Sequence, residues 1–348
     1  MSATVQADDR IMLKHGAGGR AMRRLIEEAC HRAFAFEPEL PAGLIGLTAM
    51  DDGAAMRVGD QWLVLTTDSH VIQPPFFPGG DIGRLAISGT VNDLAMMGAT
   101  EVLGLTCSLI IEEGFPRRDL DRILASMRAA CAEAHARVIT GDTKVMGKGE
   151  VDRIVINTAG IGLTPFIVRD CTLSAGDRII VTGTLGDHGM AVMATRHGLA
   201  LDAPLLSDVA PINGLIRAAL AGDPRVITAM KDPTRGGVAS ALHEMASKSR
   251  VGILIDEAAL PVKPATRSVS ELVGIDPLMI ANEGKAVIGV KAAFADGVLQ
   301  ALRAHPLGRD AAIIGVCTNE RPGMVVLDTG LGRRLLAEPE GEPLPRIC

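Results

Sequence analysis

The feature that most constrains the fold is a series of short apolar runs, each of which ends in a polar or glycine-rich turn. Examples are "LIGLTAM", "QWLVLTT", "EVLGLTCSLII" and "RIVINTAGIGL". Runs of this length and composition predict strands. Two apolar segments between them, 81–98 and 118–135, have the length and pattern of helices. The chain therefore predicts a mixed sheet with helices up to about residue 165.

A second unit follows, beginning with the strand–turn–helix pattern of "SAGDRIIVTGTLGDHGMAVMATRHG". With 348 residues, the chain is long enough for two hydrophobic cores. We expect four parts, which are a glycine-rich segment with a helix at 1–40, domains at 41–168 and 169–335, and a Pro/Glu tail at 336–348.

Composition excludes several classes of function. A net charge of −6, seven Phe, one Trp and no Tyr disfavour a nucleic-acid surface. No apolar run reaches the length of a membrane span, and the N-terminus lacks the basic and apolar regions of a signal peptide. The six cysteines form no close pair, which disfavours a zinc site or a disulfide framework. We expect a cytoplasmic, reduced protein that binds neither nucleic acid nor membrane.

Aspartates fall at the ends of several predicted strands, at positions Asp51, Asp52, Asp68 and Asp142. Acids in such places converge on one edge of a sheet, where ligands of α/β layers bind. Carboxylates brought together repel one another unless a cation joins them, and oxygen ligands suit Mg²⁺. These four are the predicted metal ligands. The alternative, that aspartate merely favours turns, stays open.

Helix 81–98 carries a polar pair, Asn92 and Asp93, among Ala, Leu, Val and Met. Burying such a pair is costly unless it has partners. We expect it to reach a metal or a nucleotide; alternatively it faces solvent or caps a neighbouring loop.

Three glycine-rich loops precede predicted helices and offer backbone N–H groups to phosphate. They are "HGAGGR", "GTLGDHGMAV" and "KDPTRGGVAS". The third is the best candidate because Lys231 and Arg235 flank it, and none matches the P-loop pattern. Ordinary turn chemistry remains the alternative for each.

Two further residues are candidate acid/base groups. Lys144 follows Asp142 by two residues, and Glu283 lies in the turn "ANEGKAV". A lysine beside phosphate clamps charge or acts as a base, and a glutamate in such a turn can take a proton. The alternative for each residue is a solvated surface charge.

These motifs, in this order, resemble the PurM-like (aminoimidazole ribonucleotide synthetase-like) ATP-dependent superfamily. The matching stretches are "DDGAAM", "TTDSHV", "GRLAISGTVNDLAMMGA", "GDTKV" and "DPTRGG". The resemblance implies an α+β fold with two domains. An N-terminal mixed sheet with helices dimerises, and a C-terminal α/β sandwich follows it. It also implies ATP and Mg²⁺ as cofactors, with nucleotide contacts from Asp51, Asp68, Asn92, Asp93, Asp142, Asp232, Arg235 and Gly236.

Within the superfamily, "HGAGG", "DPTRGG", "NEGK" and the terminal "PRIC" resemble the hydrogenase maturation family HypE. The resemblance implies that a carbamoyltransferase, HypF, places a carbamoyl group on Cys348. ATP then drives its dehydration to a thiocyanate, with Glu283 and Lys144 as acid/base residues. The cyanide passes to iron on a HypC–HypD complex and becomes a ligand of [NiFe]-hydrogenase.

The tail "EPEGEPLPRIC" suits this role. From Leu336 to Cys348 is 12 steps, and a Pro-rich segment at about 3.1 Å per residue reaches roughly 37 Å. Two other functions stay open. One is a small-metabolite kinase of the same superfamily, similar to thiamine monophosphate kinase, for which the tail is irrelevant. The other is a non-enzymatic scaffold or metal carrier whose terminal thiol binds a metal.

Overall fold

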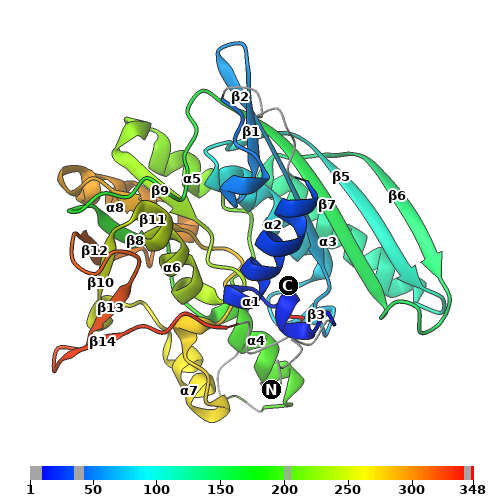
Figure 1. Ribbon diagram of the computed structural model, residues 1–348. Helices are drawn as coiled ribbons and strands as arrows, with labels where there is room; N and C mark the ends of the chain where they lie inside the picture. Colours follow the sequence, from blue (N-terminus) through cyan, green and yellow to red (C-terminus); the bar gives the residue numbers. More distant parts are fainter. Residues whose placement is uncertain (1–9, 35–42, 200, 202–204, 341–345) are drawn as a thin grey trace, which may run out of the picture.

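The computed structural model describes residues 10–34, 43–199, 201, 205–340 and 346–348. Two large sheets lie side by side, with the N-terminal sheet on the right of Figure 1 and the C-terminal one on the left. Helices pack around and between them, which confirms the predicted α+β fold with two domains. Among the described helices, none is long and apolar enough to cross a bilayer.

The first sheet has five strands in the order β1-β2-β7-β5-β6. Neighbouring strands are antiparallel except β5 and β6, which run parallel. Their bounds are β1 Ala54–Val58, β2 Gln61–His70, β5 Glu101–Glu112, β6 Val138–Met146 and β7 Ile154–Thr164. A short hairpin, β3 Phe76–Phe77 with β4 Gly80–Asp81, leads into α2.

Helices α2 (Ile82–Met96) and α3 (Arg117–Ala134) lie where the sequence predicts them. Asp81 caps α2, because its carboxylate accepts hydrogen bonds from the N–H groups of Gly83 and Arg84. The helix is buried almost throughout, as its apolar composition requires. It packs on one face of the first sheet and joins this sheet to the second domain through Ala95 and Met96.

Within the residues that the structure describes, no helix covers the other face of the first sheet. In β7, buried residues alternate with half-buried ones, so one side of the strand packs on α2 while the other side is more exposed. β6 forms the sheet's outer edge, and all nine of its residues are exposed. Exposed apolar side chains on these strands include Met56, Val58, Leu65, Leu103 and Val145.

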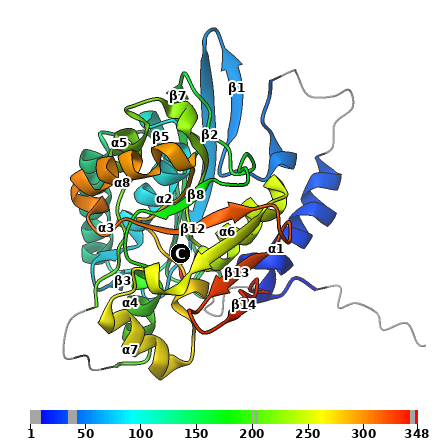
Figure 2. The same ribbon diagram turned by 90° about the vertical axis from the view of Figure 1, so that its left-hand side faces the viewer.

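The second sheet has seven strands in the order β14-β13-β10-β12-β8-β11-β9. Their bounds are β8 Arg178–Val181, β9 Ile227–Lys231, β10 Gly252–Asp256, β11 Val287–Val290, β12 Ala312–Thr318, β13 Val325–Asp328 and β14 Arg333–Leu335. One hydrophobic core lies beneath α6 (Gly237–Ser249) and another beneath α5 (Asn213–Leu220) and α8 (Ala295–Ala304), so helices cover both faces. α4 (Asp187–Arg196) and α7 (Pro264–Val273) pack together below the sheets in Figure 2.

The N-terminal segment contributes α1 (Gly19–Leu25), which continues as the π-helical η2 (Ile26–His31). It lies beside the end of the chain, in front of both domains in Figure 1. Short 3-10 helices complete the fold: η1 Leu13–Gly16, η3 Leu47–Ala49, η4 Pro224–Val226, η5 Glu257–Ala259, η6 Pro277–Met279, η7 Ala292–Phe294 and η8 Pro306–Gly308.

Candidate active site

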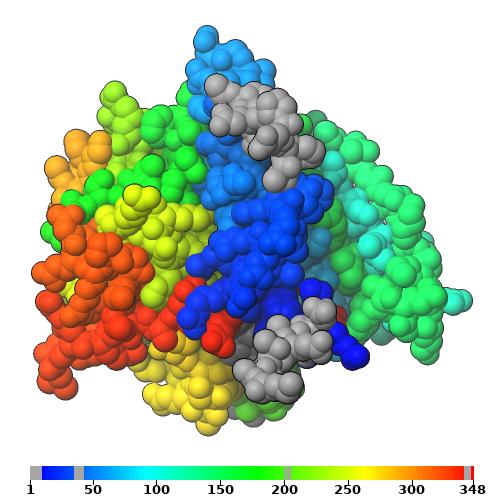
Figure 3. Space-filling view, in the orientation of Figure 1, coloured from blue at the N-terminus to red at the C-terminus, as the bar shows by residue number. Residues whose placement is uncertain are grey.

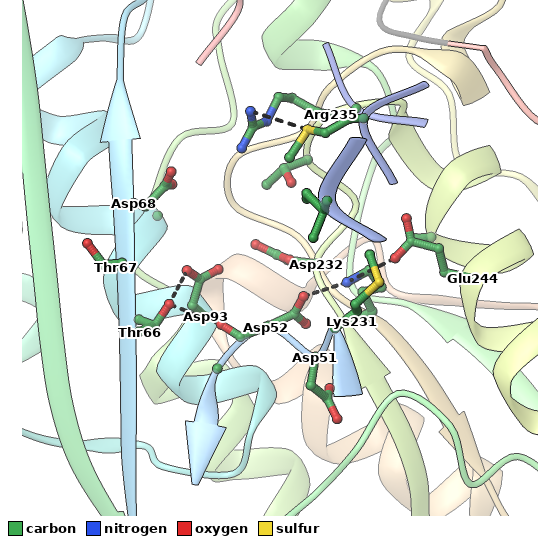
Figure 4. Close-up of a pocket in the computed structure, with 18 of the residues that line it drawn as sticks. Asp51, Asp52, Thr66, Thr67, Asp68, Asp93, Lys231, Asp232, Arg235 and Glu244 are labelled. Carbon is green, nitrogen blue, oxygen red and sulfur yellow. Dashed lines mark hydrogen bonds and ion pairs between the residues drawn. The ribbon is translucent and has the colours of Figure 1, made fainter. Parts of the chain in front are cut away.

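A cavity of about 700 Å³ lies between α1, the first sheet and the turn that joins β9 to α6. Polar side chains from both domains point into it or border it (Figure 4). They are Asp51, Asp52, Thr66, Thr67, Asp68 and Asp93 from the first domain, and Lys231, Asp232, Arg235 and Glu244 from the second. The cavity therefore collects residues from four of the predicted motifs, "DDGAAM", "TTDSHV", "GRLAISGTVNDLAMMGA" and "DPTRGG".

Four of these side chains are carboxylates that affect one another, Asp52, Asp68, Asp93 and Asp232. Burial and the neighbouring acids raise the pKa of Asp93 well above its usual value. Burial raises the pKa of Asp232 to about 6. At Asp68, burial by itself raises the pKa. His70, whose Nε2 lies 3.2 Å from Asp68 Oδ2, outweighs burial and lowers the pKa of that carboxyl to about 2. So much negative charge in one cavity favours a positively charged ligand.

A buried lysine offsets part of this charge. Lys231 Nζ lies 2.5 Å from Asp52 Oδ1 and 3.4 Å from Glu244 Oε2. Burial alone lowers a lysine's pKa, but these acids outweigh burial and raise the pKa of Lys231 well above its usual value. Glu244 also pairs with Arg23 of α1 at 3.6 Å. The predicted phosphate loop therefore contributes a lysine that is already paired with protein carboxylates.

The cavity suits a divalent cation in its chemistry, though not as a complete ligand set. In the described part of the chain, no group of three or more His, Cys, Asp or Glu is arranged to hold a metal ion. However, Asp52 Oδ2 is buried without a hydrogen-bond partner, and Asp68 and Asp93 line the same space. A metal bound partly by a substrate's phosphate oxygens needs only one or two such carboxylates.

Two of the three glycine-rich loops meet at this cavity. Arg235 Nη1 donates to Gly16 O at 3.2 Å, so "DPTRGG" packs on "HGAGG". Gly18 has φ +77°, and a Cβ there would lie 2.8 Å from Arg235 Cβ, so both conformation and space favour glycine. The third loop, "GTLGDHGMAV", contributes no residue to the cavity lining. Its Gly186 N donates instead to Asn282 Oδ1, which does not line the cavity either.

Asn92 takes the alternative role of capping a neighbouring loop. It is buried, its Nδ2 donates to Ala210 O at 3.1 Å and Glu283 O at 3.2 Å, and its Oδ1 accepts from Ile212 N at 2.8 Å. It is not among the cavity-lining residues, whereas Asp93 is. The helical polar pair is thus divided, since one member faces the cavity and the other fastens the loop that carries Glu283.

Glu283 is buried, and its Oε1 has no hydrogen-bond partner. Its backbone N–H donates to Asp208 Oδ1 at 3.1 Å, which fixes the turn. Burial, followed by the charges of Asp68 and Asp232, raises the pKa of Glu283 well above its usual value, while Arg235 acts in the opposite direction. Without a ligand, the raised pKa favours the neutral, protonated form of Glu283.

Asp51, Asp142 and Lys144 do not join the four carboxylates Asp52, Asp68, Asp93 and Asp232. Asp51 borders the cavity, but its carboxylate pairs with Arg169 at 3.2 Å and accepts from Asp170 N. Asp142 and Lys144 pair with each other at 2.8 Å on β6, with side chains 58% and 66% exposed. A single chain does not bring these last two to the cavity.

The end of the chain is docked beside the cavity. Val71 N donates to Cys348 O at 3.1 Å and Gln73 N to Arg346 O at 3.2 Å, so the last residues pair with the segment just after β2. Ile347 is buried, and its carbonyl lies 2.8 Å from His188 Nε2. The predicted carrier thiol is thus held at the end of the strand that carries Asp68.

Charge also connects this end to the site. The negative charge at Cys348 is the main cause that raises the pKa of the Arg235 guanidinium. Burial by itself lowers the pKa of Arg235, but the charges of Asp68 and Glu283 raise it, as Cys348 does. Arg235 therefore stands between the chain end and the carboxylate cavity.

Sequence reasoning assigned no histidine a role, yet His188 and His70 both matter here. His188 packs edge-on against Phe77, with ring centroids 5.2 Å apart, while its Nδ1 lies 2.8 Å from Ser207 Oγ. Burial lowers the pKa of His188, which keeps the ring neutral. The sequence signal that could have indicated a role for His188 is its position within the largely apolar segment "DHGMAVMATR", where a buried polar ring needs a partner.

The chain matches the family model for the AIR synthase related protein N-terminal domain over residues 50–164. The corresponding C-terminal domain model matches residues 174–328. A relative from Rhizobium leguminosarum bv. viciae, named "Carbamoyl dehydratase HypE", is 48% identical over 98% of this chain and 96% of its own.

Two solved structures are similar over most of the chain. A HypE chain in a HypE–HypF complex has a TM-score of 0.83 and 45% identity, covering 90% of this chain and 99% of that one. HypE in complex with ATP has a TM-score of 0.79 and 39% identity, covering 97% and 100%. With two PurM-like domains and identity of this extent along its length, the chain belongs to the HypE family of hydrogenase maturation proteins.

Proposed function

We propose that this protein uses ATP to dehydrate a carbamoyl group carried on the sulfur of its own Cys348. The observation that supports this most is the docked chain end, which places Cys348 beside Arg235 at a cavity with loops suited to phosphate. A relative 48% identical is named for carbamoyl dehydration, and a similar solved structure contains ATP.

The proposed chemistry balances in two steps. The carbamoyl oxygen attacks the γ-phosphorus of ATP, ADP leaves, and the nitrogen loses one proton to give an S-bound imidate phosphate. The nitrogen then loses its second proton, the C–O bond breaks, phosphate leaves with the oxygen, and S–C≡N remains. The products are ADP, phosphate and the thiocyanate, and no oxidant or reductant is needed.

The chain's own residues supply positioning, charge and a proton acceptor. Arg235 stabilises negative charge that develops on the transferring phosphoryl group. Asp232 directly follows β9 and Gly236 caps α6, so both belong to the proposed nucleotide-binding turn between these two elements. Glu283 becomes the base for the nitrogen protons once a cationic ligand enters and lowers its raised pKa.

Mg²⁺ fits the orphaned oxygen of Asp52 together with Asp68 and Asp93. When bound, it neutralises phosphate charge. Without Mg²⁺ these carboxylates repel one another, and burial together with this repulsion raises the pKa of Asp93.

HypF is the proposed source of the carbamoyl group, because a similar HypE structure is a complex with HypF. The thiocyanate carbon has to be passed on as cyanide, and we propose a HypC–HypD complex as its acceptor, which supplies the iron of [NiFe]-hydrogenase.

A homodimer would explain the position of Lys144. Register pairs Asp142 with Ser108 and Lys144 with Ile110, both half-buried residues of the uncovered sheet face. The cavity reaches that face at Thr67 and Ala159. We propose that a second copy covers the face and that its Lys144 and Asp142 complete the site of the first.

Mixed dimers test this arrangement. Dimers of Lys144→Ala alone or Glu283→Gln alone should dehydrate slowly, because every site lacks one group. A mixed dimer of the two variants should recover one intact site, since Glu283 comes from one copy and Lys144 from the other. Dehydration by purified mixed dimers is the measurement. Failure to recover activity, with dimers verified by sedimentation, would place both groups in one chain or remove Lys144 from the reaction.

The function itself is tested by the mass of the C-terminal peptide. With the carbamoyltransferase, carbamoyl phosphate and ATP, we expect a carbamoyl adduct on Cys348 that loses one water only with hydrolysable ATP. Absence of the adduct would contradict the proposal. Phosphorylation of a small metabolite independent of Cys348 would favour the kinase, and stoichiometric metal on the thiol without turnover would favour the carrier.

A further inference from the structure

The base of the tail is fastened to the N-terminal helix. Arg20 N donates to Pro339 O at 3.4 Å and Ala21 N to Glu340 O at 3.1 Å, so the first turn of α1 donates to tail carbonyls. These are helix-start N–H groups that have no partner within the helix. Figure 3 shows the red C-terminal segment in contact with the blue N-terminal segment on this face of the molecule.

Charged side chains reinforce the same contact. Arg23 pairs with Glu338, and both side chains are mostly buried, at 24% and 16% exposed. Arg20 pairs with Glu340 at 3.3 Å in a solvent-exposed position, which adds little. Leu336, just before, is buried, with its N–H donating to Val325 O and its carbonyl 2.8 Å from His243 Nε2.

The fastening is also linked to the cavity. Arg23 contacts Glu338 on one side and Glu244 on the other, and Glu244 contacts Lys231, the partner of Asp52. A chain of alternating charges therefore runs from the tail base to the predicted metal site. Because most of these side chains are largely buried, removing one member leaves a partly buried charge unpaired.

We propose that α1 and residues 336–340 form a fixed anchor, so that the carrier arm pivots after Glu340 and not at Leu336. Arg23 and Glu338 are then positioning residues for the thiol. This rests on the proposed function for its purpose, but the anchor itself is a property of the chain without ATP or partner.

The anchor sets how far Cys348 can travel. Eight residues follow Glu340 in the sequence, against twelve after Leu336, so an anchor that ends at Glu340 shortens the chain between the anchor and Cys348 by a third. A shorter arm also raises the effective concentration of the thiol at its dock. Because that concentration falls with about the −3/2 power of length, releasing the anchor should lower it roughly twofold.

Hydrogen exchange in the free protein tests the pivot. Ile347→Asp puts a carboxylate into a buried apolar site and should release the tip. Exchange at Val71 and Gln73, which donate to the tip, should then speed up by about tenfold or more. Exchange at Arg20 and Ala21, which donate to the tail base, should stay unchanged. If all four amides accelerate together, the tail leaves as one unit and the anchor does not exist.

A second variant opens the anchor directly. Glu338→Lys places a cation beside Arg23 and should accelerate exchange at Arg20 and Ala21 by about threefold to tenfold. Glu271→Lys, the same charge change at an exposed position of α7, is the matched control and should leave both amides unchanged. Glu338→Asp should restore most of the protection. Unchanged exchange in Glu338→Lys would remove this pair from the anchor.

Activity then separates the anchor from the proposed reaction. With S-carbamoylated Glu338→Lys, dehydration at saturating ATP should slow by roughly twofold as the arm lengthens. If amide exchange changes as predicted but neither the wild type nor any variant dehydrates the carbamoyl group, the anchor is kept and the proposed reaction is discarded. If the wild type dehydrates the carbamoyl group but amide exchange is unaltered in both variants, the proposed reaction is kept and the anchor is discarded.

Discussion

Cys348→Ala is expected to abolish both carbamoyl transfer to the tail and thiocyanate formation, while ATP binding stays intact. The sulfur is the proposed site of the carbamoyl group, and no other group at the chain end can replace a thiolate nucleophile. The docking contacts described for the chain end use the carbonyls of Arg346, Ile347 and Cys348, which the substitution keeps. The tail should therefore still dock, and the loss should be chemical.

Mass spectrometry of the C-terminal peptide measures the first effect, and calorimetric titration with a non-hydrolysable ATP analogue measures the second. Cys30→Ala removes another half-buried thiol, which the proposal gives no role, and serves as the control. A Cys348→Ala protein that still acquired and dehydrated a carbamoyl group would overturn the tail's role as substrate.

Glu283→Gln is expected to accept the carbamoyl group normally but to dehydrate it more slowly, by about 10²–10⁴-fold, the usual contribution of a general base. Glutamine matches glutamate in size, and the turn is held by backbone contacts with Asp208 and Asn92, so its geometry should survive. Single-turnover dehydration of pre-carbamoylated protein is the measurement. Glu271→Gln, an exposed carboxyl on α7, is the control, and an equal rate in both variants would exclude Glu283 as the base.

The raised pKa of Glu283 adds a pH signature to the same variant. The carboxylate form increases with pH, so the wild-type dehydration rate should rise with pH while the residual rate of Glu283→Gln should not follow that rise.

The stability of the wild-type protein should respond to pH in the opposite direction to its dehydration rate. Above the ordinary glutamate pKa the unfolded chain loses this proton while the folded protein keeps it, so this residue's contribution to stability falls as pH rises. Each pKa unit of difference corresponds to about 1.4 kcal/mol. Thermal unfolding of Glu283→Gln should therefore show a gain over the wild type that grows from pH 5 to pH 8. A constant difference would mean that Glu283 is ionised when folded.

Local pattern was enough to predict much of the fold. The apolar spacing and turn residues predicted α2 and α3 to within a few residues, because the periodicity and the flanking residues that define a helix are local in sequence. The strand-end aspartates predicted that acids would gather, and Asp51, Asp52 and Asp68 do line one cavity, whereas Asp142 does not. The glycines of "HGAGG" and "DPTRGG" predicted close backbone approach, and these loops do meet.

Pattern could not decide which member of a local pair faces the cavity. Asn92 and Asp93 are adjacent, and a rotation of about 100° per residue along a helix separates their directions. Only packing shows that Asn92 fastens the Glu283 loop. Likewise Lys231 looked like a phosphate ligand, but two carboxylates from other segments already pair with it.

The sequence by itself determined the two-domain α+β class, the motifs of the cavity and a chain end with a thiol. Those depend on residue order, periodicity and local turn chemistry, which the linear chain contains. Only the tertiary structure decided that the tail base is fastened to α1 and the tip to the segment after β2, and that Lys144 lies on an open sheet face. The physical reason is that these contacts join residues up to 320 positions apart, and a linear pattern carries no information about which distant groups meet.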